Sequence, residues 1–273
     1  MSNRLQNIFS NLQKENKKAF VSFSTAGFPD EETSLEIIKK IIDSGSHIHE
    51  ISFPHAEAQA DGPIIQLANI ESLKNGITFD KVIEIAKEVR AHNNDVGLAM
   101  MGYLNNIFIY GIEKFAKSIS GVIDAVICVD LPDVVIEEKQ LKDALRKEGI
   151  ALIKLITPTT SEERIKELVK EADGFIYSVN VEGITGVKSA QIDQVNGQIS
   201  KIKKYTDIPV VSGFGIKSVE DVEIFSKSNA DGIVVGSAIV KNIQENMKAS
   251  SDKQNVANFV GDFCKTLISH LNK

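Results

Sequence analysis

The sequence is poor in the features that mark several large classes of protein. Its two cysteines, Cys128 and Cys264, lie far apart and show no metal or redox spacing, so a reducing compartment suits the chain. Acidic residues outnumber basic ones by 37 to 31, and the net charge of -6 argues against a nucleic-acid or membrane-surface partner. The N-terminal stretch has no long apolar run and no small-residue cleavage site, so we expect neither a signal peptide nor a membrane span. A cytoplasmic protein is the expectation.

The composition that remains is that of a soluble globular protein. The chain has 273 residues, of which 42% are hydrophobic and 25% charged. No linker rich in Pro, Gly or Ser and no low-complexity segment interrupts it. We therefore expect one domain spanning residues 1–273.

Eight short β-prone runs recur along the chain. They cover residues 19–27, 47–53, 96–102, 125–130, 151–156, 174–179, 208–213 and 230–236. Several are almost continuously apolar, as strands buried on both faces require. This pattern predicts a parallel sheet that is covered on both sides.

Helical periodicity and capping residues occupy the intervals between these strands. Asp30 precedes an apolar stripe that begins at Leu35, and Gly45 ends it. Thr160 and Ser218 are each followed three positions later by an acidic residue, which predicts two capping boxes. Each predicted strand is thus followed by a helix.

Eight strand-helix pairs in a chain of this length favour a closed α/β barrel, the (β/α)8 or TIM barrel, over an open doubly wound sheet. Three helices exceed the eight-fold repeat. They are expected at the N-terminus (2–14), after the second strand (63–75, ahead of 79–91) and at the C-terminus (252–271).

A carboxylate lies within the second predicted strand, at the start of the segment EISFPHAEAQADGP (50–63). Strand residues alternate in direction, so Glu50 points into the barrel if Ile48 and Ser52 do. Catalytic groups of such barrels gather at the C-terminal ends of the strands. Burial there would raise the pKa of Glu50 and suit it to proton transfer near neutral pH. A structural ion pair with Lys or Arg explains the residue equally well.

Asp61 lies in the loop that follows the same strand. Gly62 and Pro63 come next, and Pro can occupy the first position of a helix. Taken alone, Asp61 is better explained as a helix N-cap. Two acids at the catalytic face of one strand strengthen the case for acid-base chemistry.

Three glycine-bearing loops predict a phosphate site. EGITG (182–186), SGFGIKS (212–218) and VVGSAIV (234–240) follow the sixth, seventh and eighth strands. Loops at this place in a barrel bind phosphate through backbone N–H groups and a helix N-terminus. Gly186, Gly213, Gly215 and Gly236 would let the backbone approach closely, with Ser237 adding a hydroxyl. Each glycine alone could equally serve a turn.

The sequence gives weaker support for two other kinds of active site, a metal site and a Schiff-base lysine. His47 and His49 supply too few ligands for a metal site of the kind found in barrel hydrolases. Lys154 could form a Schiff base, but its parity with Leu152 and Ile156 places it outside the barrel.

A family resemblance emerges from these segments together. AFVSFSTAGFPD, ADGPIIQ, VDLP, TPTTSEERI, GFIYSVNVEGITG, SGFGIKS and ADGIVVGSAIVK occur in this order. In them, along nearly its whole length, the chain resembles the tryptophan synthase alpha chain family. The resemblance implies cleavage of indole-3-glycerol phosphate to indole and glyceraldehyde 3-phosphate, with no metal or organic cofactor in this chain. It also implies a tryptophan synthase beta chain as partner in an α2β2 heterotetramer, with pyridoxal phosphate held by that partner.

The same resemblance implies roles for individual residues. Glu50 would protonate the indole carbon that bears the glycerol chain and help remove the hydroxyl proton, while Asp61 stabilises charge at the ring N–H. Thr185 would hold Asp61 when its loop closes. The walls of the indole slot would be Phe23, Met101, Tyr103, Ile127, Val129, Tyr177 and Phe214. The phosphate would be bound around Gly186, Gly215, Gly236 and Ser237.

The chain departs from the family pattern beside these residues. Ser52 replaces a usual Gly, and His55-Ala56-Glu57-Ala58 replaces Phe-Ser-Asp-Pro, a loss of Pro that predicts a looser loop. Asn180 and Val181 stand where Ser and Arg are common. Because the altered loop would contact the beta chain, two alternatives stay open: a stand-alone lyase and a weakly active regulatory subunit.

Overall fold

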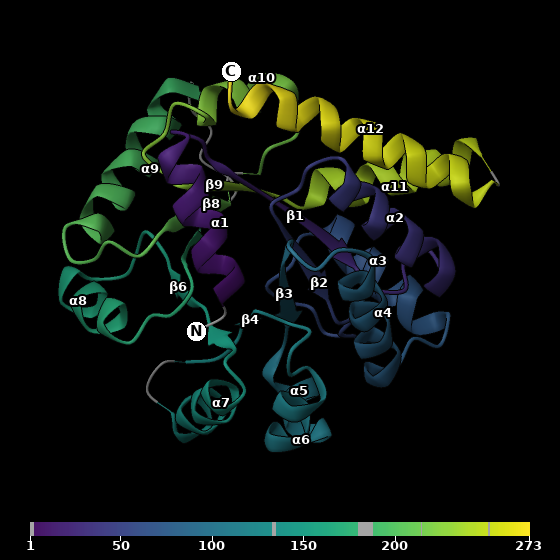
Figure 1. Ribbon diagram of the computed structural model, residues 1–273, viewed down its shortest axis with the longest axis horizontal. Helices are drawn as coiled ribbons and strands as arrows, with labels where there is room; N and C mark the ends of the chain where they lie inside the picture. The colour runs from purple at the N-terminus through teal and green to yellow at the C-terminus, as the bar shows by residue number, and fades with distance from the viewer. Residues whose placement is uncertain (1–2, 133–134, 180–187, 214, 251) are drawn as a thin grey trace.

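Nine parallel strands form one sheet at the centre of the protein, with helices around it (Figure 1). The computed structural model describes residues 3–132, 135–179, 188–213, 215–250 and 252–273. The strands are β1 (Ala19–Thr25), β2 (Ile48–Ser52), β3 (Gly97–Gly102), β4 (Ala125–Cys128), β5 (Ala151–Leu152), β6 (Lys154–Ile156), β7 (Ile176–Val179), β8 (Val210–Gly213) and β9 (Gly232–Val235). Their order in the sheet is β5-β4-β3-β2-β1-β9-β8-β7-β6.

The two edges of this sheet belong to one continuous piece of chain. β5 pairs with β4 and β6 pairs with β7, and Ile153 alone separates β5 from β6. The backbone N–H of Ile153 still donates to the carbonyl of Val126, 2.9 Å away. The run predicted as one strand over 151–156 therefore changes partner midway, and in doing so it closes the sheet. The predicted (β/α)8 barrel is confirmed, with its fifth strand in two parts.

Twelve helices are described. They are α1 (Asn3–Lys14), α2 (Glu31–Asp43), α3 (Pro63–Lys74), α4 (Phe79–His92), α5 (Leu104–Tyr110), α6 (Ile112–Ser118), α7 (Ile136–Lys147), α8 (Glu162–Lys170), α9 (Lys188–Lys203), α10 (Val219–Phe225), α11 (Ser237–Ala249) and α12 (Lys253–Leu271). The predicted extra helices are confirmed as α1, α3 and α12. Within the described residues, no helix combines the length and apolar character needed to cross a membrane.

The caps of these helices agree with the sequence in two cases and differ in one. Asp30 accepts a hydrogen bond from the backbone N–H of Thr33, and Ser218 caps α10. The capping box predicted at Thr160 was wrong by one residue, because Ser161 caps α8. The Thr160 hydroxyl instead accepts a hydrogen bond from the backbone N–H of Thr157, which stabilises the preceding turn.

Helix α1 closes the end of the barrel at which the strands begin. Leu5, Phe9 and Leu12 on α1 are buried in the same cluster as inward-facing strand residues such as Ile48. An added Cβ on Gly97, the first residue of β3, would lie only 2.9 Å from Leu5 Cδ2, so glycine permits this close approach. In Figure 1, α1 lies across the middle of the barrel. The opposite end, where the strands finish, is left for the site.

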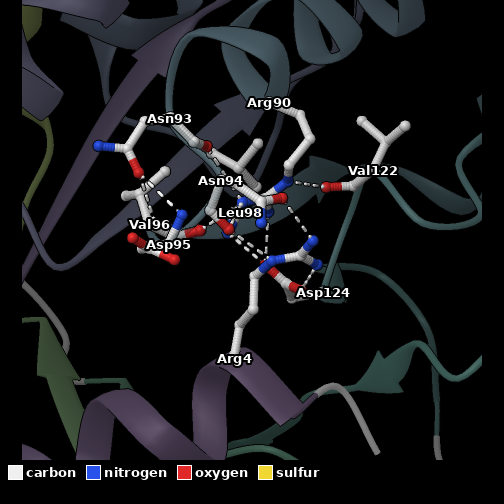
Figure 2. Close-up of polar contacts among 9 residues, drawn as sticks. All are labelled: Arg4, Arg90, Asn93, Asn94, Asp95, Val96, Leu98, Val122 and Asp124. Atoms are coloured by element: carbon white, nitrogen blue, oxygen red, sulfur yellow. Dashed lines mark hydrogen bonds and ion pairs between the residues drawn. The ribbon is translucent and has the colours of Figure 1, made fainter.

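A buried charge network fastens α1 to the barrel (Figure 2). The Asp124 carboxylate, just before β4, lies 3.1 Å from Arg4 Nη1 and 2.7 Å from Arg90 Nη2. Its Oδ2 also accepts a hydrogen bond from the backbone N–H of Leu98. Arg90 Nε in turn donates to the carbonyl of Val122. The contacts join α1, α4 and the starts of β3 and β4, and they satisfy the buried carboxylate.

Candidate active site

Glu50 lies on β2 with its side chain directed into the barrel. It is fully buried, and its neighbours across the sheet are Phe23 on β1 and Ala99 on β3. Ile48, two residues earlier, belongs to the cluster that fills the barrel interior, whereas Ile51 packs in the layer between sheet and helices. The predicted alternation along this strand is therefore confirmed.

The Glu50 carboxyl group has no hydrogen-bond partner among the residues that the structure describes. Neither oxygen makes a hydrogen bond, although both are inaccessible to solvent. The described part of the chain therefore does not supply the structural ion pair considered from the sequence. Burial raises the pKa of Glu50 to about 8, so the group is mostly protonated at neutral pH. Such a group can give a proton to a substrate and then take one back.

Asp61 is held by side chains from α3 and from the N-cap of α5. Its Oδ2 accepts a hydrogen bond of 3.1 Å from the Tyr103 hydroxyl and lies 3.5 Å from Nδ2 of Asn69. Burial is the largest influence on the pKa of Asp61 and raises it, while these two hydrogen bonds act in the opposite direction. Gly62, not Asp61, is the N-cap of α3, and Pro63 begins the helix. The simpler explanation of Asp61 as a helix cap is thus wrong.

Tyr177 on β7 lies within electrostatic range of both carboxyl groups. Burial raises the pKa of its phenol well above the usual range, and the charges of Glu50 and Asp61 both add to the rise. Both acids therefore influence one hydroxyl group on a strand that lies across the barrel from β2.

Four of the residues predicted as walls of the slot lie in or against the cluster that fills the barrel interior. Ile127 belongs to the barrel-interior cluster, and Met101, Val129 and Tyr177 pack against it. Phe23 is buried next to Glu50 on the neighbouring strand, and the Tyr103 ring is buried at the start of α5. Thr185, Phe214 and Gly186, which the sequence also placed here, lie outside the described residues. The described walls are apolar or aromatic, which suits a flat apolar ring.

The glycine loops begin at neighbouring strand ends. Val179 on β7 aligns with Gly213 on β8, which aligns with Val234 on β9. Gly215 has a φ of 63°, a conformation that favours glycine. Gly236 is the N-cap of α11 and Ser237 its first residue, with no side chain capping this helix end. The backbone N–H groups and dipole of α11 therefore provide a place for an anion.

Sequence reasoning missed three polar residues of this region. Thr25 Oγ1 on β1 is buried and has no hydrogen-bond partner in the described part of the chain, and Thr25 has the same parity as Phe23. Asn69 approaches Asp61, and Gln66 Nε2 donates to the carbonyls of Ala58 and Asp61. Strand alternation could have indicated Thr25. The roles of Asn69 and Gln66 depend on how α3 folds back over the loop, which periodicity does not reveal.

His49 on β2 and His47, just before this strand, both make structural hydrogen bonds. Nδ1 and Nε2 of His49 lie 2.7 and 3.0 Å from the hydroxyls of Ser22 and Ser24, and burial lowers the His49 pKa to about 3. Nδ1 of His47 accepts a hydrogen bond from the backbone N–H of Phe20. In the described part of the chain, no group of three or more His, Cys, Asp or Glu side chains could hold a metal ion.

Lys154 faces the helices and not the barrel interior. Its Nζ lies 2.7 Å from Glu138 Oε1 on α7, and both side chains are buried. The parity inferred from the sequence is confirmed, since Ile153 lies in the barrel-interior cluster and Ile156 in the outer layer. A Schiff-base role for Lys154 is therefore not compatible with this geometry.

Comparison with known proteins gives one consistent result. The family profile described as tryptophan synthase alpha chain matches residues 9–267. The tryptophan synthase alpha chain of Geotalea uraniireducens is 40% identical over 243 residues, covering 89% of this chain and 90% of that protein. A solved tryptophan synthase alpha chain from Legionella pneumophila has a TM-score of 0.87 at 28% identity, covering 98% of this chain and 97% of its own. A solved Aquifex aeolicus protein has a TM-score of 0.86 at 33% identity, covering 99% of each chain.

Proposed function

The chain belongs to the tryptophan synthase alpha chain family, whose lyase activity cleaves indole-3-glycerol phosphate, and we propose that Glu50 and Asp61 carry this reaction. The observation that supports the proposal most directly is the buried carboxyl group of Glu50, which has no hydrogen-bond partner among the described residues. A group in that state is available to the substrate alone. Its pKa of about 8 keeps a proton on it at neutral pH.

The reaction begins with the protonated form of Glu50. The carboxyl gives its proton to the indole carbon that bears the glycerol chain, and positive charge spreads to the ring N–H. Asp61 accepts a hydrogen bond from that N–H and stabilises the charge. The hydrogen bonds that Tyr103 and Asn69 donate to Asp61 favour its ionised form.

The second step returns the proton. The Glu50 carboxylate takes the proton from the hydroxyl on the adjacent chain carbon, the carbon-carbon bond breaks, and its electron pair restores the aromatic ring. Indole and glyceraldehyde 3-phosphate leave, and Glu50 is again protonated. The phosphate of the substrate is bound at the N-terminus of α11, around Gly236 and Ser237.

The proposal is tested by incubating the protein with indole-3-glycerol phosphate and measuring indole and triose phosphate. We expect Glu50→Gln to lower turnover by about 100-fold or more, the usual contribution of general acid-base catalysis. Glu57→Gln is the matched control, because Glu57 is an exposed carboxylate of the following loop. A Glu50→Gln protein as active as the control would remove Glu50 from the mechanism.

We further propose a tryptophan synthase beta chain as partner, in an α2β2 heterotetramer whose pyridoxal phosphate belongs to the beta chain. Solved structures entitled tryptophan synthase from M. tuberculosis share this fold. Large apolar side chains are exposed on α5, where Ile109 is 77% and Phe108 57% accessible, and on α3, at Leu67. These helices follow the neighbouring strands β2 and β3 at the catalytic end. An apolar surface of this kind suits a protein interface.

Gel filtration with and without a beta chain separates this arrangement from a stand-alone lyase. We expect a larger complex and faster indole release when the beta chain is present. Turnover only in its presence would instead favour the regulatory-subunit alternative. We place the reaction in the cytoplasm.

A further inference from the structure

The loop that carries Asp61 is held in place by the Tyr103 hydroxyl group. This hydroxyl accepts a hydrogen bond of 2.9 Å from the backbone N–H of Ala60 and donates one of 3.1 Å to Asp61 Oδ2. Tyr103 comes directly after β3 and precedes α5. One phenol therefore fixes both the backbone of the loop and the carboxylate that it presents.

The ring of His55 covers the ring of Tyr103. The two ring centroids are 4.8 Å apart and the planes differ by 21°, which is a stacked arrangement. His55 is half-buried at the start of the loop, next to Pro54, whose carbonyl accepts a hydrogen bond from Asn106 Nδ2. The start of the loop is therefore anchored, and the imidazole ring is held over the phenol.

We propose that His55 is a positioning residue for Asp61, acting by stacking on Tyr103. The inference rests on the proposed function, in which Asp61 stabilises the charge at the ring N–H. His55 itself touches no substrate. Its ring limits the rotation of the Tyr103 side chain about χ1. That rotation would move the hydroxyl group and break its contacts to Ala60 and Asp61 together.

The other contacts of the loop do not replace this one. Gln66 Nε2 donates to the carbonyls of Ala58 and Asp61, so it holds the backbone and leaves the carboxylate free to turn. The contact from Asn69 to the carboxylate is long, at 3.5 Å. Tyr103 is therefore the stronger of the two donors to the Asp61 side chain.

When it is protonated, the imidazole also lowers the pKa of Asp61 through its charge. Among the influences on the Asp61 pKa, this charge is the smallest, after burial and the hydrogen bonds from Tyr103 and Asn69. Stacking requires a flat ring at position 55, whereas the electrostatic effect requires a charge there. A phenylalanine keeps the flat ring and removes the charge, so it separates the two.

The test compares steady-state cleavage of indole-3-glycerol phosphate by four proteins: the parent, His55→Ala, His55→Phe and Gln59→Ala. Stacked aromatic pairs of this kind correspond to an effect of about three- to ten-fold, so we expect His55→Ala to lower kcat by that factor. KM should stay within about two-fold, because the substrate is bound mainly by the slot and the phosphate site. His55→Phe should restore kcat, and Gln59→Ala, an exposed residue of the same loop, should leave it unchanged.

Two results would overturn the proposal. One is a His55→Ala protein with parental kcat. The other is a His55→Phe protein as slow as His55→Ala, which would assign the effect to charge or hydrogen bonding.

A double-mutant cycle shows whether His55 acts through Tyr103. Tyr103→Phe removes the hydroxyl that reaches Ala60 and Asp61. In that background His55→Ala should lower kcat by less than two-fold, because the group it positions is gone. Two fully additive effects would contradict the inference.

Amide hydrogen exchange at Ala60 tests, independently of catalysis, whether the stacking of His55 on Tyr103 holds the loop. The Ala60 N–H is bonded to Tyr103, so His55→Ala should speed its exchange by about three- to ten-fold and His55→Phe should not. If the parent protein fails to cleave the substrate, the proposed function is wrong, and this exchange still decides the role of His55. Unchanged exchange in His55→Ala would refute the stack as a constraint on the loop.

Discussion

Substitution of Glu50 by Gln should make the folded protein more stable at neutral pH while removing its activity. The buried carboxyl has a pKa of about 8 in the folded protein, against an ordinary value of 4.5. Between these values the unfolded chain has lost the proton and the folded chain has kept it. The stability that Glu50 contributes is therefore fully present below pH 4.5 and is lost as the pH rises to about 8. Gln cannot ionise, so the variant escapes this loss.

The size of the stability loss follows from the distance between the pH of the experiment and the ordinary pKa of glutamate. At pH 7 that distance is about 2.5 pH units, which at about 1.4 kcal/mol per unit amounts to about 3 kcal/mol. At pH 9 the loss has levelled off at about 5 kcal/mol. The Gln amide is itself buried without partners, but this adds an offset that does not change with pH. The pH dependence of the difference is therefore the quantity to measure.

Urea unfolding of both proteins at several pH values from 4 to 9 provides the measurement. The free energy of unfolding of Glu50→Gln minus that of the parent should be flat near pH 4, rise through neutral pH and level off above pH 8. All other titrating groups are common to both proteins and cancel in the difference. A difference that stays constant across this range would show that Glu50 is not held protonated, and the mechanism proposed for it would lose its acid.

Three further predictions concern the packing and the rejected alternative. Leu5→Ala should lower the free energy of unfolding by about 3 kcal/mol, as for other buried leucines, and a smaller change in urea would show that α1 packs loosely. Asp124→Ala leaves Arg90 without its buried partner and should cost about 3–5 kcal/mol in the same assay, whereas a change below 1 kcal/mol would contradict the network. Borohydride added during turnover should leave the mass of the protein unchanged, because Lys154 faces Glu138; a trapped adduct would revive Schiff-base chemistry.

Much of the fold was predictable because buried parallel strands have a strong local signature. The eight apolar runs gave the barrel, and Asp30 and Gly45 gave the limits of α2. The break at Ile153 could not be predicted, because it depends on which strands lie on either side once the barrel closes. The cap at Ser161 was missed for a local reason, since Thr160 and Ser161 can both cap a helix and the Thr160 hydroxyl is used by the turn at Thr157.

The candidate site also has features that the sequence predicts and features that it does not. Glu50 was predictable because a charged residue inside an apolar strand stands out and alternation gives its direction. Its lack of partners was not, because that depends on every side chain around it. The bond from Tyr103 to Asp61 joins residues 42 positions apart, and the stack of His55 on Tyr103 joins two loops. Such contacts follow from how neighbouring strands are aligned, and no local pattern records them.

The adjacent residues His49 and Glu50 point to opposite faces of β2 and titrate abnormally in opposite directions. His49, neutral between two serines, has a pKa of about 3, so the stability it contributes is present above pH 6.5 and declines on acidification. Glu50 has the reverse dependence on the alkaline side. These two neighbours therefore limit the pH range of greatest stability, His49 on the acidic side and Glu50 on the alkaline side. The barrel is most stable in the mildly acidic interval between these limits. A homologue with an apolar residue at position 49 should tolerate acid better and alkali no worse.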